Sequence, residues 1–170
     1  DGLFDGSDWE GREEKVLKTI DNISKNICHS VTVSTMHGCP PKEIEAICSF
    51  LLTEKKLDTF VKLNPTLLGY DTVRKVLDDL GYGYVVLKRE SFEHDLQLAD
   101  AKAMLHRLVD LAKKEGRKFG VKLTNTLGNV NPQDVLPGDE RYGSGRILLP
   151  LSSRVALILS EEFDGTLPIS

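Results

Sequence analysis

The segment Phe60-Val61-Lys62-Leu63-Asn64-Pro65 decides the fold class of this chain. Its apolar side chains alternate with polar ones, which is typical of a β-strand, and the proline ends the strand because it cannot donate a ladder hydrogen bond. The same pattern returns in Phe119-Gly120-Val121-Lys122-Leu123-Thr124. Stretches with apolar residues at helical spacing separate such segments, and strands that alternate with helices run parallel. The sequence therefore predicts an α/β fold made of parallel (β/α) units of a TIM barrel.

Strands and helices alternate along most of the chain. Pro41 opens one helix well, since its missing N–H costs no hydrogen bond in a first turn. The expected helices cover residues 12–26, a stretch beginning near Pro41, a stretch around 70–80, residues 95–115 and residues 151–163. The expected strands cover residues 30–34, 60–64, 84–88, 119–124 and 167–169.

The length of 170 residues falls short of a complete barrel, which needs about 250. We expect residues 1–30 to form a lead-in segment and helix, and residues 31–170 to form a partial (β/α)8 barrel. A glycine- and proline-rich stretch at about 125–150 is expected to be a long functional loop. The chain is expected to be a piece of a larger protein and to be inactive in isolation.

The composition excludes several classes of protein. There are 22 Lys and Arg residues against 26 Asp and Glu residues, a net charge of −4, which argues against binding to nucleic acid or to an anionic membrane surface. No apolar run approaches the ~20 residues of a membrane span. Three cysteines without C-x-x-C spacing suggest neither disulfides nor a metal site, so we expect a cytoplasmic protein.

Three lysines lie toward the carboxyl ends of expected strands, where barrel enzymes place their sites. If the apolar side chains of each strand pack on helices, then Lys62, Lys88 and Lys122 face the barrel interior, where an unpaired charge is costly. This arrangement, with Asn64 beside it, predicts a site for an anion such as a phosphate, a carboxylate or a flavin. The alternative is that each lysine reaches solvent or pairs with a nearby acid such as Glu90.

Cys39 lies in Met36-His37-Gly38-Cys39-Pro40-Pro41, between a strand and a helix N-terminus. The helix dipole favours a thiolate there, and His37 can add charge or a proton path, so a reactive thiol or general base is one interpretation. The other is a small buried residue at the helix entry. The chain has neither G-x-G-x-x-G nor a P-loop motif, which argues against those nucleotide-binding folds.

Several segments, in order, resemble the flavin barrel of dihydroorotate dehydrogenases and the matching domain of dihydropyrimidine dehydrogenase. Residues 60–65 resemble the V-K-L-x-P strand of that family, and Thr124-Asn125-Thr126 resembles its strand-end N-T. Tyr142-Gly143-Ser144-Gly145-Arg146 resembles its glycine-rich loop, and Cys39-Pro40 resembles its C-P. The resemblance implies that Lys62 contacts the FMN ring, that Asn125 and Thr126 bind substrate or flavin, and that Cys39 is the acid or base. It further implies that Ser144 and Gly145 line the cofactor edge.

A closer resemblance is to the N-terminal barrel of putative selenate reductase subunits of bacteria. It rests on residues 34–41, 59–69 and 120–127. It implies an FMN-linked oxidoreductase barrel within a larger iron–sulfur flavoprotein that transfers electrons. The expected cofactors outside this chain are 4Fe-4S clusters, FAD and NAD(P), and the expected partners are other redox domains or subunits and a small-molecule substrate.

Two departures from the flavin-barrel pattern keep other interpretations open. Met36 stands where the family has an asparagine, and residues 84–118 separate the V-K-L-x-P and N-T motifs that lie on successive strands in the better-known enzymes. One alternative is a degenerate, non-catalytic barrel that serves as a scaffold for redox domains. Another is an aldolase-type barrel in which Lys122 or Lys62 forms a Schiff base.

Overall fold

A computed structural model describes residues 11–24, 26–35, 37–132 and 137–170 of the chain, so residues 1–10 of the expected lead-in segment lie outside it. A parallel three-stranded sheet forms its centre, with β1 (Ser30–Ser34), β2 (Asp58–Leu63) and β3 (Phe119–Leu123) in the order β1-β2-β3. The strand expected at residues 167–169 is reduced to a single parallel bridge, in which Ile169 pairs with Val121 beside β3. The predicted α/β class with parallel strands is confirmed, and the barrel is not closed.

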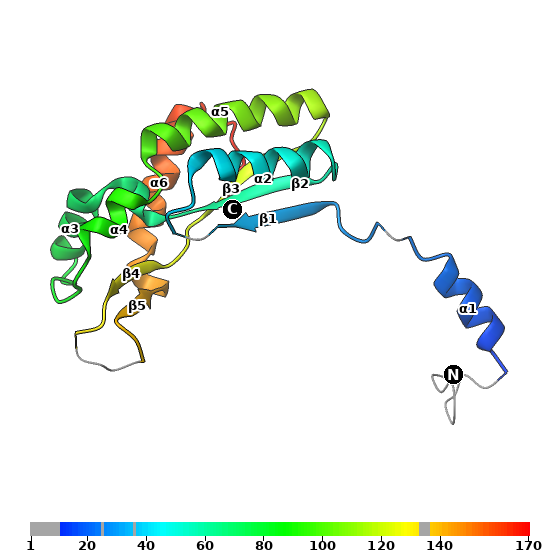
Figure 1. The fold of residues 1–170 in the computed structure, drawn as a ribbon, viewed down its shortest axis with the longest axis horizontal. Helices are drawn as coiled ribbons and strands as arrows, with labels where there is room; N and C mark the ends of the chain where they lie inside the picture. Colours follow the sequence, from blue (N-terminus) through cyan, green and yellow to red (C-terminus); the bar gives the residue numbers. More distant parts are fainter. Residues whose placement is uncertain (1–10, 25, 36, 133–136) are drawn as a thin grey trace.

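Helices cover one face of this sheet. Figure 1 shows α2 (Pro41–Thr53) and α5 (Leu98–Glu115) on the same side of it, where α2 packs against both β2 and α5. The helix α6 (Leu149–Glu162) also contacts β3. The other described helices are α1 (Glu13–Asp21), α3 (Tyr70–Asp79) and α4 (Arg89–His94), with the 3₁₀ turns η1 (Pro65–Leu68) and η2 (Gly145–Ile147). No described helix is long and apolar enough to cross a membrane.

The two faces of the sheet differ as the alternation predicts. Val61 and Val121 are fully buried beneath the helices, whereas Lys62 is half-buried and Lys122 is exposed on the opposite face. The stripe of α2 that completes this core consists of Ile44, Cys48 and Leu52, spaced four residues apart. The polar face of the sheet therefore carries the candidate site residues.

The expected strand at residues 84–88 was wrong. Val85 and Leu87 are buried while Val86 is exposed, so the apolar alternation is real, but the segment is not part of the sheet. Its backbone groups find other partners: the Arg74 guanidinium donates to the Val85 carbonyl, and the Val130 amide donates to the Val86 carbonyl at 2.8 Å. An alternating pattern reports which side chains are buried, not what pairs with the backbone.

Two expected helices have different bounds. The helix expected at 95–115 begins only at Leu98, as α5, and a separate short helix, α4, precedes it. Asp95 lies in the connection between the two helices, where its carboxylate accepts hydrogen bonds from other parts of the fold. The helix expected at 12–26 ends at Asp21. No residue of α1 is buried, so its apolar side chains have no core to pack against and do not stabilise a longer helix. Figure 1 shows α1 apart from the sheet.

The stretch expected to be one irregular loop contains regular structure. Its described part holds an antiparallel pair, β4 (Leu127–Val130) and β5 (Glu140–Gly143), and α6 begins earlier than expected. Residues 133–136 of that stretch lie outside the described residues. The strand β4 follows β3 closely, so the pair lies next to the carboxyl end of the sheet (Figure 1).

Candidate functional site

Polar side chains from the three strand ends meet at the carboxyl edge of the sheet. Asn125, which follows β3, donates through Nδ2 to Asn64 Oδ1 at 2.6 Å, and Asn64 follows β2. Ser34, the last residue of β1, donates to Asn125 Oδ1 at 3.3 Å. The Asn125 amide also donates to the Leu63 carbonyl at 2.8 Å. Because parallel strands end at the same edge, side chains distant in sequence form one network there.

Asp95 is the buried centre of this network, with a side chain only 2% exposed. Its Oδ1 accepts from the Gly38 amide at 2.8 Å. Its Oδ2 accepts from Thr66 Oγ1 at 2.7 Å and from Asn64 Nδ2 at 3.0 Å. A buried carboxylate is tolerated only when it is well supplied with donors, and this one ties the β1–α2 loop, η1 and the end of β2 together.

His37 is the charged partner of Asp95. Its Nδ1 lies 2.8 Å from Asp95 Oδ2, and its side chain is 41% exposed. The hydrogen bond to Asp95 raises the pKa of His37 above 6.5 despite partial burial, and the charge of Glu140 adds to the rise. Burial alone would raise the pKa of Asp95, but the bonds from His37, Thr66 and Gly38 outweigh it and hold that pKa below 3.8.

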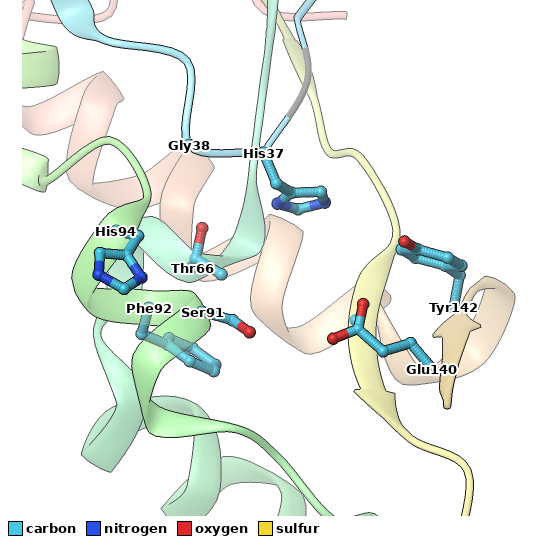
Figure 2. Close-up of a pocket in the computed structure, with 9 residues that line it drawn as sticks. His37, Gly38, Thr66, Ser91, Phe92, His94, Glu140 and Tyr142 are labelled. Carbon is cyan, nitrogen blue, oxygen red and sulfur yellow. The ribbon is translucent and has the colours of Figure 1, made fainter. Parts of the chain in front are cut away.

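A cavity of about 180 Å³ opens beside this pair (Figure 2). His37 stands over it between two groups of side chains, with Thr66 and Phe92 on one side and Glu140 and Tyr142 on the other. The remaining lining residues are Gly38, Ser91, His94 and Gly128. The cavity thus combines one aromatic wall with several hydrogen-bonding groups, as small-molecule sites do.

The structure separates the three lysines predicted to hold an anion. Lys62 and Lys122 are register partners on β2 and β3, and neither side chain has an ion pair or hydrogen bond within the described part of the chain. Lys88 instead bonds to Glu140 at 2.9 Å, and that hydrogen bond raises its pKa. Lys62 and Lys122 therefore have no counter-charge, whereas Lys88 forms an ion pair with Glu140.

Cys39 has surroundings that disfavour its thiolate. Partial burial raises the pKa of the thiol, and the charge of Glu43, whose Oε2 lies 4.0 Å from Sγ, adds to the rise. The helix that follows offers little compensation, because Pro40 and Pro41 have no N–H. These surroundings oppose the expected activation of the thiol by the helix dipole, and the role of Cys39 stays a prediction.

We expect the three thiols to alkylate at very different rates. Cys28 is exposed, Cys39 is half-buried, and Cys48 is fully buried with burial raising its pKa to about 12. Because the thiolate is the nucleophile, iodoacetamide under native conditions should label Cys28 first, Cys39 more slowly and Cys48 not at all. Peptide mapping by mass spectrometry measures the order, with the denatured protein as the reference. Fast labelling of Cys39 would restore the reactive-thiol interpretation.

The other predicted cofactor residues lie outside the hydrogen-bond network. Thr126 is half-buried between β3 and β4, whereas Ser144 and Gly145 are exposed where β5 leads into η2. Gly145 has a φ of 69°, which favours glycine, and a Cβ there would meet nothing within 4 Å. Met36, at the departure from the family pattern, lies outside the described residues.

Asp95 and Thr66 are site residues that no pattern in the sequence indicates. Asp95 precedes an apolar helix, which reads as an ordinary helix start, and nothing local indicates that its carboxylate turns inward. Thr124 was also missed as a positioning contact: its Oγ1 lies 3.0 Å from Ser152 Oγ of α6. In the described ranges no cluster of three or more His, Cys, Asp or Glu side chains is placed to hold a metal ion.

Comparison with known proteins identifies the domain. The family model described as "Oxidoreductase YgfK, N-terminal TIM-barrel domain" matches residues 7–170. The chain belongs to this family. Among its relatives, the putative oxidoreductases YgfK of Escherichia coli strains K12 and O157:H7 are each 62% identical over 148 residues, which is 87% of this chain. No solved structure matches it.

The chain spans only 14% of the length of these two YgfK relatives. The family places this part at the N-terminus of an oxidoreductase, as a TIM-barrel domain. The three parallel strands and their covering helices correspond to part of such a barrel, and the network at their carboxyl ends occupies the edge where barrel enzymes build their sites.

Proposed function

We propose that this domain binds the ring end of a flavin, FMN, for the oxidoreductase to which it belongs. The observation that carries the proposal is the register pair Lys62 and Lys122, two cations side by side with no carboxylate partner among the described residues. Neighbouring strands lie about 4.8 Å apart, so the two side chains share one small region of the open face. An anionic ligand relieves their mutual repulsion.

The residues around the two lysines fit the edge of a flavin ring. Such a ring presents carbonyl oxygens and ring nitrogens, and it becomes anionic when reduced, so it needs cations and hydrogen-bond donors. Asn64 and Asn125 lie at the ends of the same two strands, and Ser34 ends the next one.

The lysines and the network have different tasks in this proposal. The flavin, when bound, supplies hydride transfer. Lys62 and Lys122 stabilise negative charge on it, and the hydrogen bonds among Asn64, Asn125 and Asp95 hold the strand ends in position. The phosphate of the cofactor would be held by later parts of the protein.

The rest of the oxidoreductase completes the proposal. We expect iron–sulfur clusters, FAD and NAD(P) sites in its other parts, with this barrel exchanging electrons with them. The selenate reductase type remains part of the same proposal and is supported by the sequence resemblance of residues 34–41, 59–69 and 120–127. A scaffold without cofactor is the competing outcome of the experiment below.

We expect full-length protein with Lys62→Ala to bind FMN at least about tenfold more weakly, because a charge-assisted contact contributes about 1.5–3 kcal/mol. Lys62→Ala with Lys122→Ala should abolish retention. The measurement is flavin absorbance of the purified protein and FMN released on denaturation, followed by titration of the depleted protein. Lys114→Ala, an exposed lysine on α5, is the matched control and should bind FMN normally. Unchanged FMN affinity in the double variant, or a wild-type protein without FMN affinity, would favour the scaffold.

A further inference from the structure

His37 offers one free ring nitrogen to the cavity. The carboxylate of Asp95 can only accept, so Nδ1 carries a proton and donates to Asp95 Oδ2 at 2.8 Å. The other ring nitrogen, Nε2, has no partner among the described residues. In the neutral ring Nε2 is an acceptor, and in the charged ring it is a donor, so this atom can both give and take a proton.

Asp95 fixes the position of this ring. The carboxylate is held from three other directions, by Gly38, Thr66 and Asn64. The imidazole therefore lies against a rigid acceptor rather than against another mobile surface side chain. A fixed, oriented histidine with one nitrogen bonded to a buried carboxylate and the other open to a cavity has the geometry of a general acid and base.

We propose that His37 is the proton donor and acceptor of this cavity, with Asp95 as its positioning residue, for a small neutral molecule whose carbonyl oxygen meets Nε2. As hydride adds to the carbonyl carbon, the electron pair of the C=O π bond moves to oxygen, the Nε2–H bond breaks and an O–H bond forms, so that a neutral carbonyl becomes a neutral alcohol and the imidazolium becomes neutral imidazole beside an ionised Asp95. The reverse step restores the imidazolium. The proposal deepens the proposed function, on which it rests for the accompanying hydride.

The charges around His37 favour a neutral ligand. Glu140 lines the cavity but is paired with Lys88, and His37 is paired with Asp95, so the two pairs leave no net charge to attract an ion. Phe92 provides an apolar wall. The titratable and charged groups facing His37 are Asp95, Glu140, Lys88, His94 and Tyr142. Of these groups, Asp95 and Glu140 raise the pKa of His37, so the ring is largely charged at mildly acidic pH.

The protonation of His37 can be measured in the full-length protein by diethyl pyrocarbonate. Of the two forms of histidine, this reagent modifies the neutral imidazole and not the imidazolium. Peptide mapping follows each histidine separately as the pH is varied. We expect the midpoint for His37 to lie above 6.5, the usual value. In Asp95→Asn the midpoint should fall, because the hydrogen bond to the charged carboxylate is what raises the pKa of His37, and modification below both midpoints should become severalfold faster. His94, which lines the same cavity, reports access of the reagent.

Two further experiments test the proposal. Glu43→Gln, which changes the surroundings of Cys39 rather than of His37, should leave the midpoint of His37 unchanged. Acetamide, as the carbonyl probe, should slow modification of His37 more than acetate at matched ionic strength. A wild-type midpoint at or below 6.5, a midpoint insensitive to Asp95→Asn, or equal or better protection by acetate would overturn it. These readouts need no flavin, so absence of FMN binding would refute the proposed function alone.

Discussion

Asp95→Ala is expected to destabilise the carboxyl edge of the sheet by at least about 3 kcal/mol, because it removes the common acceptor of four donors. The Asn125 amide reports this loss well, since its own acceptor, the Leu63 carbonyl, is untouched by the substitution. Hydrogen exchange of the corresponding peptide in the full-length protein should accelerate more than about a hundredfold if the strand ends open together.

The stabilisation by Asp95 should depend on pH in both directions. The pKa of Asp95 is lowered on folding, so its contribution is present above 3.8 and is lost as the pH falls through the folded value. The pKa of His37 is raised, so its contribution is complete below 6.5 and is lost as the pH rises through the folded value. The difference between wild type and Asp95→Ala should therefore be largest between these two limits.

A surface aspartate provides the matched control for Asp95. Asp110 on α5 is exposed and lies 3.8 Å from Lys113, so Asp110→Ala should change exchange of the Asn125 amide little. If Asp95→Ala behaves like Asp110→Ala, the hydrogen bonds to Asp95 are not what holds the strand ends together.

The strands of the sheet could be predicted because their side chains carry the necessary signal. In residues 60–64 and 119–124 one set of side chains is buried under helices and the other is not, so the period of two is visible in the sequence. Residues 84–88 show the same period for another reason. There Val85 and Leu87 are buried because they pack into the core. The carbonyls of Val85 and Val86 accept hydrogen bonds from Arg74 and from the Val130 amide and not from a neighbouring strand of the sheet. No local pattern distinguishes the two cases.

The absence of a strand at residues 84–88 bears on one departure from the flavin-barrel pattern, the long stretch of sequence between the V-K-L-x-P and N-T motifs. With residues 84–88 outside the sheet, β2 and β3 are direct neighbours, and Lys62 lies beside Lys122. The motifs around Lys62 and Asn125 are therefore on adjacent strands, as in the resembling enzymes. Helices and connections fill the sequence between the two motifs, so their distance in sequence does not separate them in space.

The candidate site was only partly predictable. The lysines and Asn64 could be placed at strand ends, because strand direction and side-chain alternation are sequence properties. Asp95 could not, because its role depends on where the connection between α4 and α5 lies relative to the β1–α2 loop. Contacts between residues more than fifty positions apart are set by the tertiary fold.

The second large effect is expected at Gly120 in β3. A Cβ there would lie 2.6 Å from Phe60 Cε1 and 2.6 Å from the Pro168 carbonyl oxygen. The ring of Phe60 can rotate, but the Pro168 carbonyl accepts from the Val121 amide at 2.9 Å, so it cannot retreat without breaking the bridge to β3. Gly120→Ala should therefore cost about 1–3 kcal/mol and detach residues 168–170 from β3.

Hydrogen exchange of the Leu123 amide, which donates to the Ser170 carbonyl at 2.9 Å, measures this detachment in the full-length protein. Exchange about tenfold to a hundredfold faster than in wild type is expected. Gly128→Ala is the matched control, since it is also a strand glycine and its Cβ would meet only Tyr142 Cε1, at 3.9 Å. If the two variants exchange alike, the close approach at Gly120 has relaxed at no cost. If only Gly120→Ala exchanges faster, the missing side chain is what lets the last strand join the sheet.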